Sequence, residues 1–95
     1  MFEIVLKSEA VRALRTMRPF HATAIVDAIE RNLRIAPEKT SSTTIKRLRG
    51  RQRSVFRLRV GEHRVFHDVS GGIVEVVAIL HTSETAGFYR RGQEP

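Results

Sequence analysis

The sequence contains no cysteine, which excludes disulfide bonds and thiolate chemistry. It has no apolar run long enough for a signal peptide or a membrane span, and no basic leader follows Met1. P-loop, GxGxxG, HExxH and paired CxxC motifs are also missing. Carboxylates at a spacing suited to Mg²⁺ are too few, so we expect no metal and no cofactor. Together these absences predict a soluble, cytoplasmic protein without a membrane partner.

Acidic residues are few beside the basic ones, and the excess of positive charge is concentrated. The chain of 95 residues has 17 Lys and Arg against 10 Asp and Glu, a net charge of +7. Eight of the 17 basic residues lie between Lys46 and Arg64, where Glu62 is the only acidic residue. A solvated basic surface is common in small proteins, but here the charge is clustered rather than dispersed. The clustering favours binding to a polyanion, most simply nucleic acid, or to an acidic protein.

Two amphipathic segments predict a helical hairpin that covers one face of a sheet. The first helix is expected from Ser8, a plausible N-cap, to about Arg18, and the second from Phe20 to Ile35. Pro19 separates them, because proline ends one helix and is tolerated in the first turn of the next. Each helix has an apolar stripe at core-facing spacing: Ala10, Ala13, Leu14 and Met17 in the first, and Ala22, Val26, Ile29 and Leu33 in the second.

The segment from Ser54 to Val69 predicts a β-hairpin that gathers arginines on one face. Hydrophobic residues alternate with arginines before Gly61-Glu62, a two-residue turn that suits the twist of paired strands. This turn sets four opposite pairs: Val60 with His63, Arg59 with Arg64, Leu58 with Val65, and Arg57 with Phe66. Residues directly opposite share a face, so one face carries the three arginines beside one phenylalanine. A slip of one residue would exchange the two faces.

The remaining segments complete a single α+β domain over residues 1–95. Strands are expected at Phe2 to Leu6 and at Ile73 to Leu80, the latter nearly all apolar and suited to a central strand. Residues 38–44 are expected to form a loop, residues 45–53 a short turn and a basic loop, and residues 81–95 a partly irregular end. The predicted order is β-α-α-β-β-β. It gives a mostly antiparallel four-stranded sheet with the helical hairpin on one face and an open basic face on the other.

Three sequence segments in this order carry a family resemblance. They are KRLRG at residues 46–50, FRLRVGEHRVFH at residues 56–67, and VVAILHT at residues 76–82, which Tyr89 follows. The whole chain resembles the RelE/ParE superfamily of toxins from bacterial type II toxin–antitoxin pairs. The resemblance implies a RelE-like fold. Members of the RelE branch cleave messenger RNA, usually on the ribosome, by attack of a ribose 2′-hydroxyl on the adjacent phosphate, whereas members of the ParE branch act on DNA gyrase.

The resemblance to the RelE branch also implies catalytic residues. Arg57, Arg59 and Arg64 match its basic positions, and Tyr89 matches its C-terminal tyrosine. Arginine suits phosphate binding because it is planar, bidentate and always charged, but it is a poor proton shuttle. Many RelE-like members have lysine at the first two of these positions. Five further basic residues are expected to bind RNA: Lys46, Arg47, Arg49, Arg51 and Arg53.

A histidine is the obvious source of proton transfer, because imidazole titrates near neutrality. His81, expected at the end of the last strand beside the cleft, is the first candidate for base or acid; a strand-end residue bonded to backbone is an equally good interpretation of it. His63 is second because it lies beside the turn, although the register puts it on the face opposite Arg64. His67 is third, and a hydrogen-bonded core histidine is the better interpretation of that residue. His21 is expected at the surface.

The resemblance, together with the clustered arginines, favours a metal-independent endoribonuclease of the RelE kind that inhibits translation. The expected partners are an acidic cognate antitoxin, messenger RNA and the ribosome. The alternative is a non-enzymatic inhibitor of DNA gyrase of the ParE kind. Arginine in place of lysine at positions 57 and 59 favours that alternative, as does the absence of an arginine just after the last strand. A basic RNA-binding module without catalysis is the third interpretation.

Overall fold

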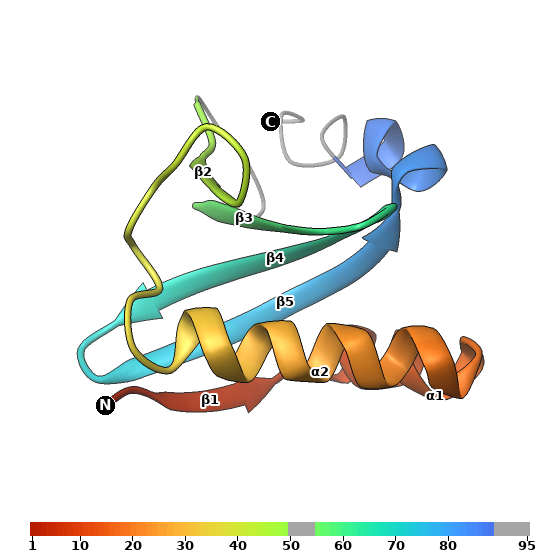
Figure 1. Cartoon of the computed structure of the whole chain (residues 1–95), viewed down its shortest axis with the longest axis horizontal. Coiled ribbons are helices and arrows are strands. Elements are labelled where there is room, and N and C mark those ends of the chain that lie inside the picture. The colour runs from red at the N-terminus through yellow and green to blue at the C-terminus, as the bar shows by residue number, and fades with distance from the viewer. Residues whose placement is uncertain (50–54, 89–95) are drawn as a thin grey trace.

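The computed structural model describes residues 1–49 and 55–88, which form a sheet with a pair of helices along one side (Figure 1). The elements are β1 (Glu3–Leu6), α1 (Ser8–Thr16), α2 (Pro19–Leu33), β2 (Ile45–Arg47), β3 (Phe56–Val60), β4 (His63–Ser70), β5 (Ile73–His81) and the 3₁₀-helix η1 (Thr82–Glu84). Residues 85–88 are helical. The predicted α+β class is confirmed, and the two helices cover one face of the sheet as expected.

The described residues place five strands in one sheet, in the order β1-β5-β4-β3-β2. β1 runs parallel to β5, and the other neighbours are antiparallel. The sequence predicted four strands, because β2 is only three residues long and two of its residues are charged. Its first residue, Ile45, is buried opposite Leu58 of β3, and this contact supplies the hydrophobic anchor for the extra strand.

Pro19 sets the boundary between the two helices. The residue before a proline is pushed away from helical geometry, and Arg18 has φ −62° and ψ 142°. Met17 is also extended, so α1 ends two residues earlier than predicted. Pro19 then opens α2 in the position where its missing N–H costs nothing. The predicted cap at Ser8 is wrong, because Ser8 is the first helical residue and Lys7 caps the helix without a side-chain hydrogen bond.

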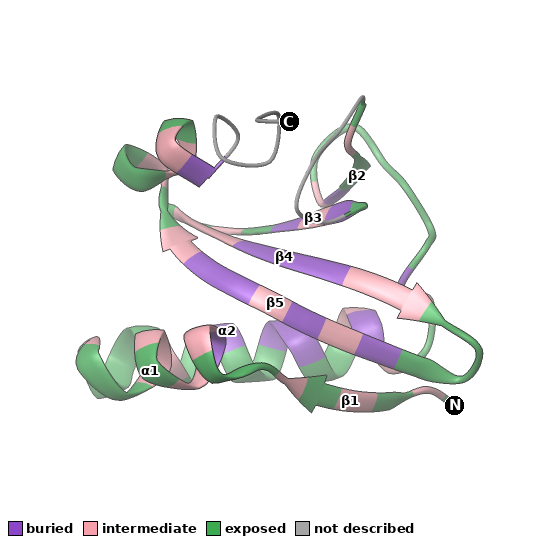
Figure 2. Cartoon of the chain, turned by 180° about the vertical axis from the view of Figure 1, so that it is seen from behind, coloured by how far each residue is buried: buried purple, intermediate pink, exposed green. Residues whose placement is uncertain are grey.

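The main hydrophobic core lies between the helices and the sheet. Figure 2 shows the buried residues along β3, β4 and β5 and on the inward side of α2. α1 packs chiefly against β5, and α2 packs against β3. The largest fully buried hydrophobic side chains of this core are Ile25, Leu33, Leu58, Val65, Val74 and Val76. Burying each such side chain stabilises the fold by about 1.5–3 kcal/mol.

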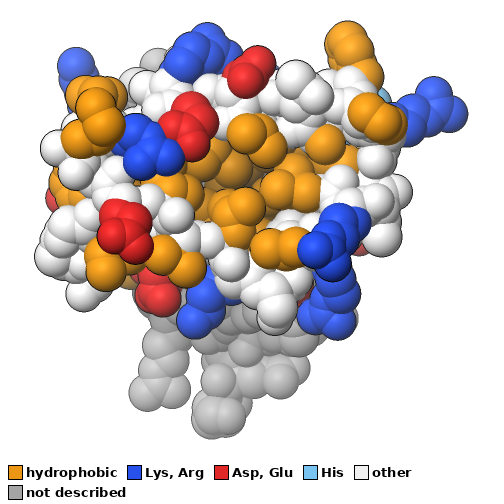
Figure 3. Space-filling model, turned by 90° about the horizontal axis from the view of Figure 1, so that it is seen from below, with side chains coloured by type: hydrophobic (Ala, Val, Ile, Leu, Met, Phe, Trp, Pro, Cys, Tyr) orange, Lys and Arg blue, Asp and Glu red, His pale blue; other side chains and the backbone are white. Residues whose placement is uncertain are grey.

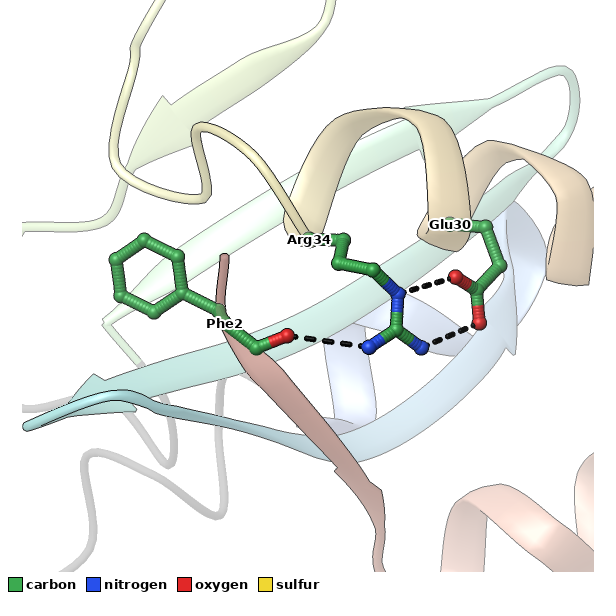
Figure 4. A network of polar contacts seen from close by, with 3 residues as sticks. All are labelled: Phe2, Glu30 and Arg34. Carbon is green, nitrogen blue, oxygen red and sulfur yellow. Dashed lines mark hydrogen bonds and ion pairs between the residues drawn. The ribbon is translucent and has the colours of Figure 1, made fainter.

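A polar contact joins the end of α2 to the start of β1. The Arg34 guanidinium donates to both carboxylate oxygens of Glu30, one turn earlier, and to the backbone carbonyl of Phe2 at 3.1 Å (Figure 4). The Phe2 N–H donates in turn to the Arg34 carbonyl at 2.8 Å. The hydrogen bonds between the two side chains raise the pKa of the Arg34 guanidinium and lower the pKa of the Glu30 carboxylate. One side chain therefore fixes the parallel edge strand to the helix layer.

Candidate functional site

The β3–β4 hairpin has the predicted register. Val60 pairs with His63, Arg59 with Arg64, Leu58 with Val65, and Arg57 with Phe66. Gly61 opens the turn with φ 58°, a conformation that favours glycine. Arg57, Arg59 and Arg64 therefore share the sheet face that points away from the helices, while Leu58 and Val65 are buried beneath the helices. We call the first of these surfaces the arginine face.

β2 adds one more cation to the arginine face. Lys46 pairs with Arg57, so both lie in the same cross-strand row, and the Lys46 side chain is exposed. Arg47 pairs with Phe56 and lies on the opposite side of β2, where its guanidinium is 5.6 Å from the centroid of the Phe56 ring. Of the two predicted RNA-binding residues in β2, only Lys46 is brought to the arginines. Arg49 is exposed in the chain after β2.

The three arginines differ in how far water reaches them. Arg59 is exposed, while Arg57 and Arg64 are half-buried. The Arg57 Nε atom is buried and has no hydrogen-bond partner among the described residues. The Arg64 Nη1 atom donates to the Gly61 carbonyl at 2.8 Å and to the His63 carbonyl at 2.9 Å. The Arg64 guanidinium thus lies against the turn at the end of the hairpin.

Part of the arginine face is covered, which differs from the expected open surface. Phe66 is fully buried, because the Phe88 ring stacks on it with centroids 4.0 Å apart. Ala78 of β5 is also buried there, and Leu48, Val77 and Leu80 pack around these three residues. The C-terminal helical residues therefore form a second, smaller hydrophobic cluster on the face opposite the main core. Cations and a covered apolar patch lie side by side on the arginine face.

His81 does not lie on the arginine face. It pairs with His63, which pairs in turn with Val60, and Val60 packs against the main core on the helix side of the sheet. A β-bulge between Phe66 and His67 sets this register of β5. His81 is exposed and caps η1: its Nδ1 accepts from the Ser83 N–H at 3.2 Å. The predicted first candidate for proton transfer is thus separated from the arginines by the sheet.

His67 is a core residue, as the better of its two interpretations predicted. Its side chain is fully buried, and its Nε2 atom lies 2.9 Å from the Pro37 carbonyl. The ring also stacks on Phe56, with centroids 5.4 Å apart. Burial lowers the pKa of His67, because a charged imidazole loses its hydration there. His67 is therefore expected to act in the fold and not in chemistry.

Three predicted site residues fall outside the described part of the chain, and that part contains neither a metal-ion cluster nor a membrane-spanning helix. Tyr89, Arg51 and Arg53 lie outside the described residues. Within residues 1–49 and 55–88, no three histidine, aspartate or glutamate side chains are grouped so that they could hold a metal ion. No helix in these ranges has both the length and the apolar character needed to cross a bilayer.

Comparison with known proteins gives a family match and structural relatives. A family model described as the ParE toxin of the type II toxin–antitoxin system parDE matches residues 4–86. No curated protein matches the sequence. The RelE–RelB complex from Pyrococcus horikoshii gives a TM-score of 0.68 at 17% identity, covering 84% of this chain and 93% of the other. The RelB–RelE complex from Methanococcus jannaschii gives 0.67 at 21%, covering 90% and 98%. RelBE2 from Mycobacterium tuberculosis gives 0.66 at 20%, covering 84% and 96%. At these identities the structural relatives establish the fold alone.

Proposed function

Because the chain belongs to the ParE toxin family of type II toxin–antitoxin systems, we propose that it is a toxin whose arginine face binds and cleaves messenger RNA. The observation that carries this proposal is the hairpin register, which gathers Arg57, Arg59 and Arg64 on one face with Lys46 beside them. Directly opposed like charges destabilise a sheet, and Arg59 is directly opposite Arg64. A bound phosphate chain would relieve that repulsion.

Arginine is suited to the charge that develops during cleavage. Attack of a ribose 2′-hydroxyl on the adjacent phosphate builds negative charge on the phosphoryl oxygens, and a guanidinium can donate two parallel hydrogen bonds to them. Arg57 is half-buried, and its Nε has no partner among the described residues, so its charge is less screened by water than that of the exposed Arg59. We expect Arg57 and Arg64 to hold the reacting phosphate and Arg59 and Lys46 to hold its neighbours.

No histidine lies on the described arginine face to transfer protons. The described residues place His63, His67 and His81 on the helix side of the sheet. Electrostatic stabilisation and orientation of the 2′-hydroxyl are therefore expected to supply most of the rate, with Tyr89 as the remaining candidate acid. We infer a slow, metal-independent nuclease that depends on the ribosome to orient its substrate. Its products should end in a 2′,3′-cyclic phosphate and a 5′-hydroxyl, since the 2′-oxygen is the nucleophile.

An antitoxin is the second expected partner, and the helix side offers it a surface. Figure 3 views the molecule from the side of β1, α1 and α2, where hydrophobic side chains gather in a central hollow with charged side chains around it. Exposed hydrophobic residues of these elements include Val5, Phe20 and Val26. An amphipathic segment can bury its apolar side there. We propose that the antitoxin covers this hollow and places acidic residues against the arginine face, where they would block RNA binding.

Inhibition of DNA gyrase is the alternative, and two observations favour it. The matching family model is that of ParE toxins. The described arginine face also lacks a histidine for proton transfer, as noted above. In this alternative the arginines bind an acidic protein surface and transcripts remain intact.

One expression experiment distinguishes the two. The toxin is expressed from a tightly repressed promoter, and cellular transcripts are mapped for new 5′-hydroxyl ends while DNA breaks are scored in the same cultures. We expect cuts within reading frames, and we expect Arg59→Ala to reduce them while Arg31→Ala, an exposed arginine on α2, does not. Intact transcripts with DNA breaks and filamentous cells would show that gyrase is the target.

A further inference from the structure

Three of the four histidines of the chain meet at one end of the sheet. His21 is in the first turn of α2, His63 begins β4 and His81 ends β5. The His21 and His63 ring centroids are 5.5 Å apart, and so are those of His63 and His81. Phe20 extends this row, since its ring meets His21 edge to face at 5.5 Å. Four aromatic rings from three elements thus line one region on the helix side.

These rings border a cavity of about 360 Å³. Phe20 stands at its rim with 78% of its surface exposed, which is unusual for a large apolar side chain. The wall is mostly apolar and includes Phe20, His21, Ile25, Val60, His63 and His81. Small-molecule pockets range from about 300 to 1,000 Å³, so this cavity suits a single flat ring system and not a larger ligand.

The ring nitrogens at the cavity are available to a ligand. Neither His21 nor His63 makes a side-chain hydrogen bond within the described part of the chain, whereas His81 has its Nδ1 occupied by Ser83. Burial lowers the pKa of His63, and the imidazoles of His81 and His21 lower it further, which favours the neutral form of this ring. A neutral imidazole offers one donor and one acceptor, the pattern found on the edge of a nucleobase.

The nearby carboxylates are engaged within the protein. Glu84 accepts from the His81 N–H at 3.0 Å, and Glu62 accepts from the Thr82 hydroxyl at 3.3 Å. The Thr82 N–H also donates to the Glu62 carbonyl at 2.9 Å, which ties η1 to the β3–β4 turn. The acidic groups therefore brace the cavity wall, and Arg64 directly follows His63 in the chain.

Arg64 connects this cavity to the arginine face. Its guanidinium donates to the carbonyls of Gly61 and His63, two residues that line the cavity. A single turn thus separates the half-buried cation from the row of rings. We propose that the cavity binds an unpaired nucleobase, stacked among Phe20, His21 and His63, whose own phosphate is held by Arg64. This inference rests on the proposed RNA-binding function and names the place where one base of the RNA is held.

A nucleobase fits these features better than a peptide side chain does. Unpaired bases are recognised by stacking on phenylalanine and histidine rings, with hydrogen bonds to the base edge. The phosphate beside each base needs a cation within one nucleotide's length, and Arg64 supplies it at the turn. An apolar peptide anchor would use the cavity volume but would leave the His21 and His63 nitrogens without partners.

The first test follows the histidine rings directly. Ring signals of ¹⁵N-labelled toxin are recorded by NMR during titration with adenosine, AMP, UMP and inorganic phosphate. We expect the His21 and His63 signals to shift with the nucleoside and with both nucleotides, while buried His67 serves as an internal control that does not move. Phosphate alone should leave His21 and His63 unchanged. Absence of a shift at millimolar AMP, or an equal shift with phosphate, would overturn the proposal.

The second test uses variants and short single-stranded RNA that lacks 2′-hydroxyls at the cleavage site. Phe20→Ala should weaken binding roughly tenfold at every salt concentration, because stacking is insensitive to salt. The matched control is Val26→Ala, also exposed on α2, which should bind like the wild type. Arg59→Ala should instead lower the salt slope by about 0.7. Unchanged affinity of Phe20→Ala would sink the inference.

The two tests separate this inference from the proposed function. If transcripts are cut in cells while the His21 and His63 signals do not shift with nucleotides, the cavity proposal fails and the nuclease proposal stands. If the rings respond while transcripts stay intact, the nuclease fails and the base site stands.

Discussion

The two faces of the β3–β4 hairpin share one set of backbone pairs and carry opposite chemistry. On the arginine face, Arg59 lies directly opposite Arg64, a pairing that costs stability. On the helix face, one row closer to the core, Leu58 lies opposite Val65 and both are fully buried. The buried row can stabilise a hairpin that also holds repelling charges. The comparison teaches that the helix side supplies the main core, while the arginine face carries its cations beside the smaller cluster around Phe66 and Phe88.

The second difference between the faces lies in their histidines. The helix side carries His63, His67 and His81, while the described arginine face carries none. A surface rich in guanidinium groups and without imidazole can hold a phosphate strongly but transfers protons poorly. The imidazole row is instead beside an apolar cavity, where rings can stack on a base. We therefore expect phosphate to bind on the arginine side of the β3–β4 turn and a base to bind on the helix side.

The largest expected effect comes from removing two arginines from one face. Arg59→Ala with Arg64→Ala should reduce RNA cleavage by about 10³-fold, because Arg64 is expected to hold the reacting phosphate, where one hydrogen-bond donor contributes about 10²–10³-fold, and Arg59 a neighbouring phosphate. Thermal stability should be equal or slightly higher, since the two like charges are opposed. Cleavage is measured with a defined message on ribosomes, and unfolding by circular dichroism. The matched control removes two helix arginines, Arg15 and Arg31, and should keep its activity.

His81→Gln examines the same comparison from the helix side. Glutamine retains an acceptor for the Ser83 N–H but cannot shuttle protons. Because His81 lies across the sheet from the arginines, we expect kcat to stay within about threefold of the wild type. KM should rise, because His81 lines the cavity proposed to bind a base. A fall in kcat of about 100-fold or more would mean that proton transfer reaches the phosphate from the helix side, and the separation of roles between the faces would be wrong.

The next largest effect concerns the patch that covers part of the arginine face. Phe88 is fully buried and stacks on Phe66, so Phe88→Ala should cost about 3–5 kcal/mol of unfolding free energy. Phe88→Leu should recover part of that loss because it keeps an apolar side chain in the same space. Urea denaturation followed by circular dichroism measures both. A loss below about 1 kcal/mol for the alanine variant would show that this cluster adds little to the fold.

Acidification should weaken the helix side and leave the arginine face unaffected. The pKa values of His63 and His67 are lowered in the folded protein, so the unfolded chain binds more protons than the native state below the ordinary histidine value. Unfolding free energy should therefore fall as the pH drops from 7.5 to 5.

The matched variant for this pH effect is His67→Leu. It loses the contact with the Pro37 carbonyl and should be less stable at pH 7.5, but it should show a smaller drop in stability between pH 7.5 and pH 5. Denaturant titrations at the two pH values measure the difference. An identical drop in variant and wild type would assign the pH dependence to other groups.

The sequence predicted the elements whose patterns are local. The alternation before Gly61 determined the hairpin register, because each residue's face follows from the turn. The strand of β2 was missed because Lys46 and Arg47 give no hydrophobic signal, and its pairing depends on Ile45 reaching the core. The face of His81 could not be predicted either. β5 is nearly all apolar and shows no alternation, and the bulge opposite Phe66 and His67 that fixes its register comes from tertiary pairing.

The smallest expected effect concerns the contact that joins the edge strand to the helix layer. Arg34→Lys keeps the charge but loses the two-pronged contact with Glu30, and a lysine cannot reach both that carboxylate and the Phe2 carbonyl in the same fixed geometry. Because the contact is exposed, we expect only a slight decrease in the unfolding midpoint, which should shrink further in high salt. Glu30→Gln should give a similar decrease, and the two changes combined should cost no more than either alone, since both remove the same interaction.

Hydrogen exchange at the amide of Phe2, which donates to the Arg34 carbonyl, is the more sensitive measurement. Faster exchange there with an unchanged midpoint would show that the contact holds β1 locally, whereas a large loss of global stability would show that the helix side depends on its edge as much as on its core.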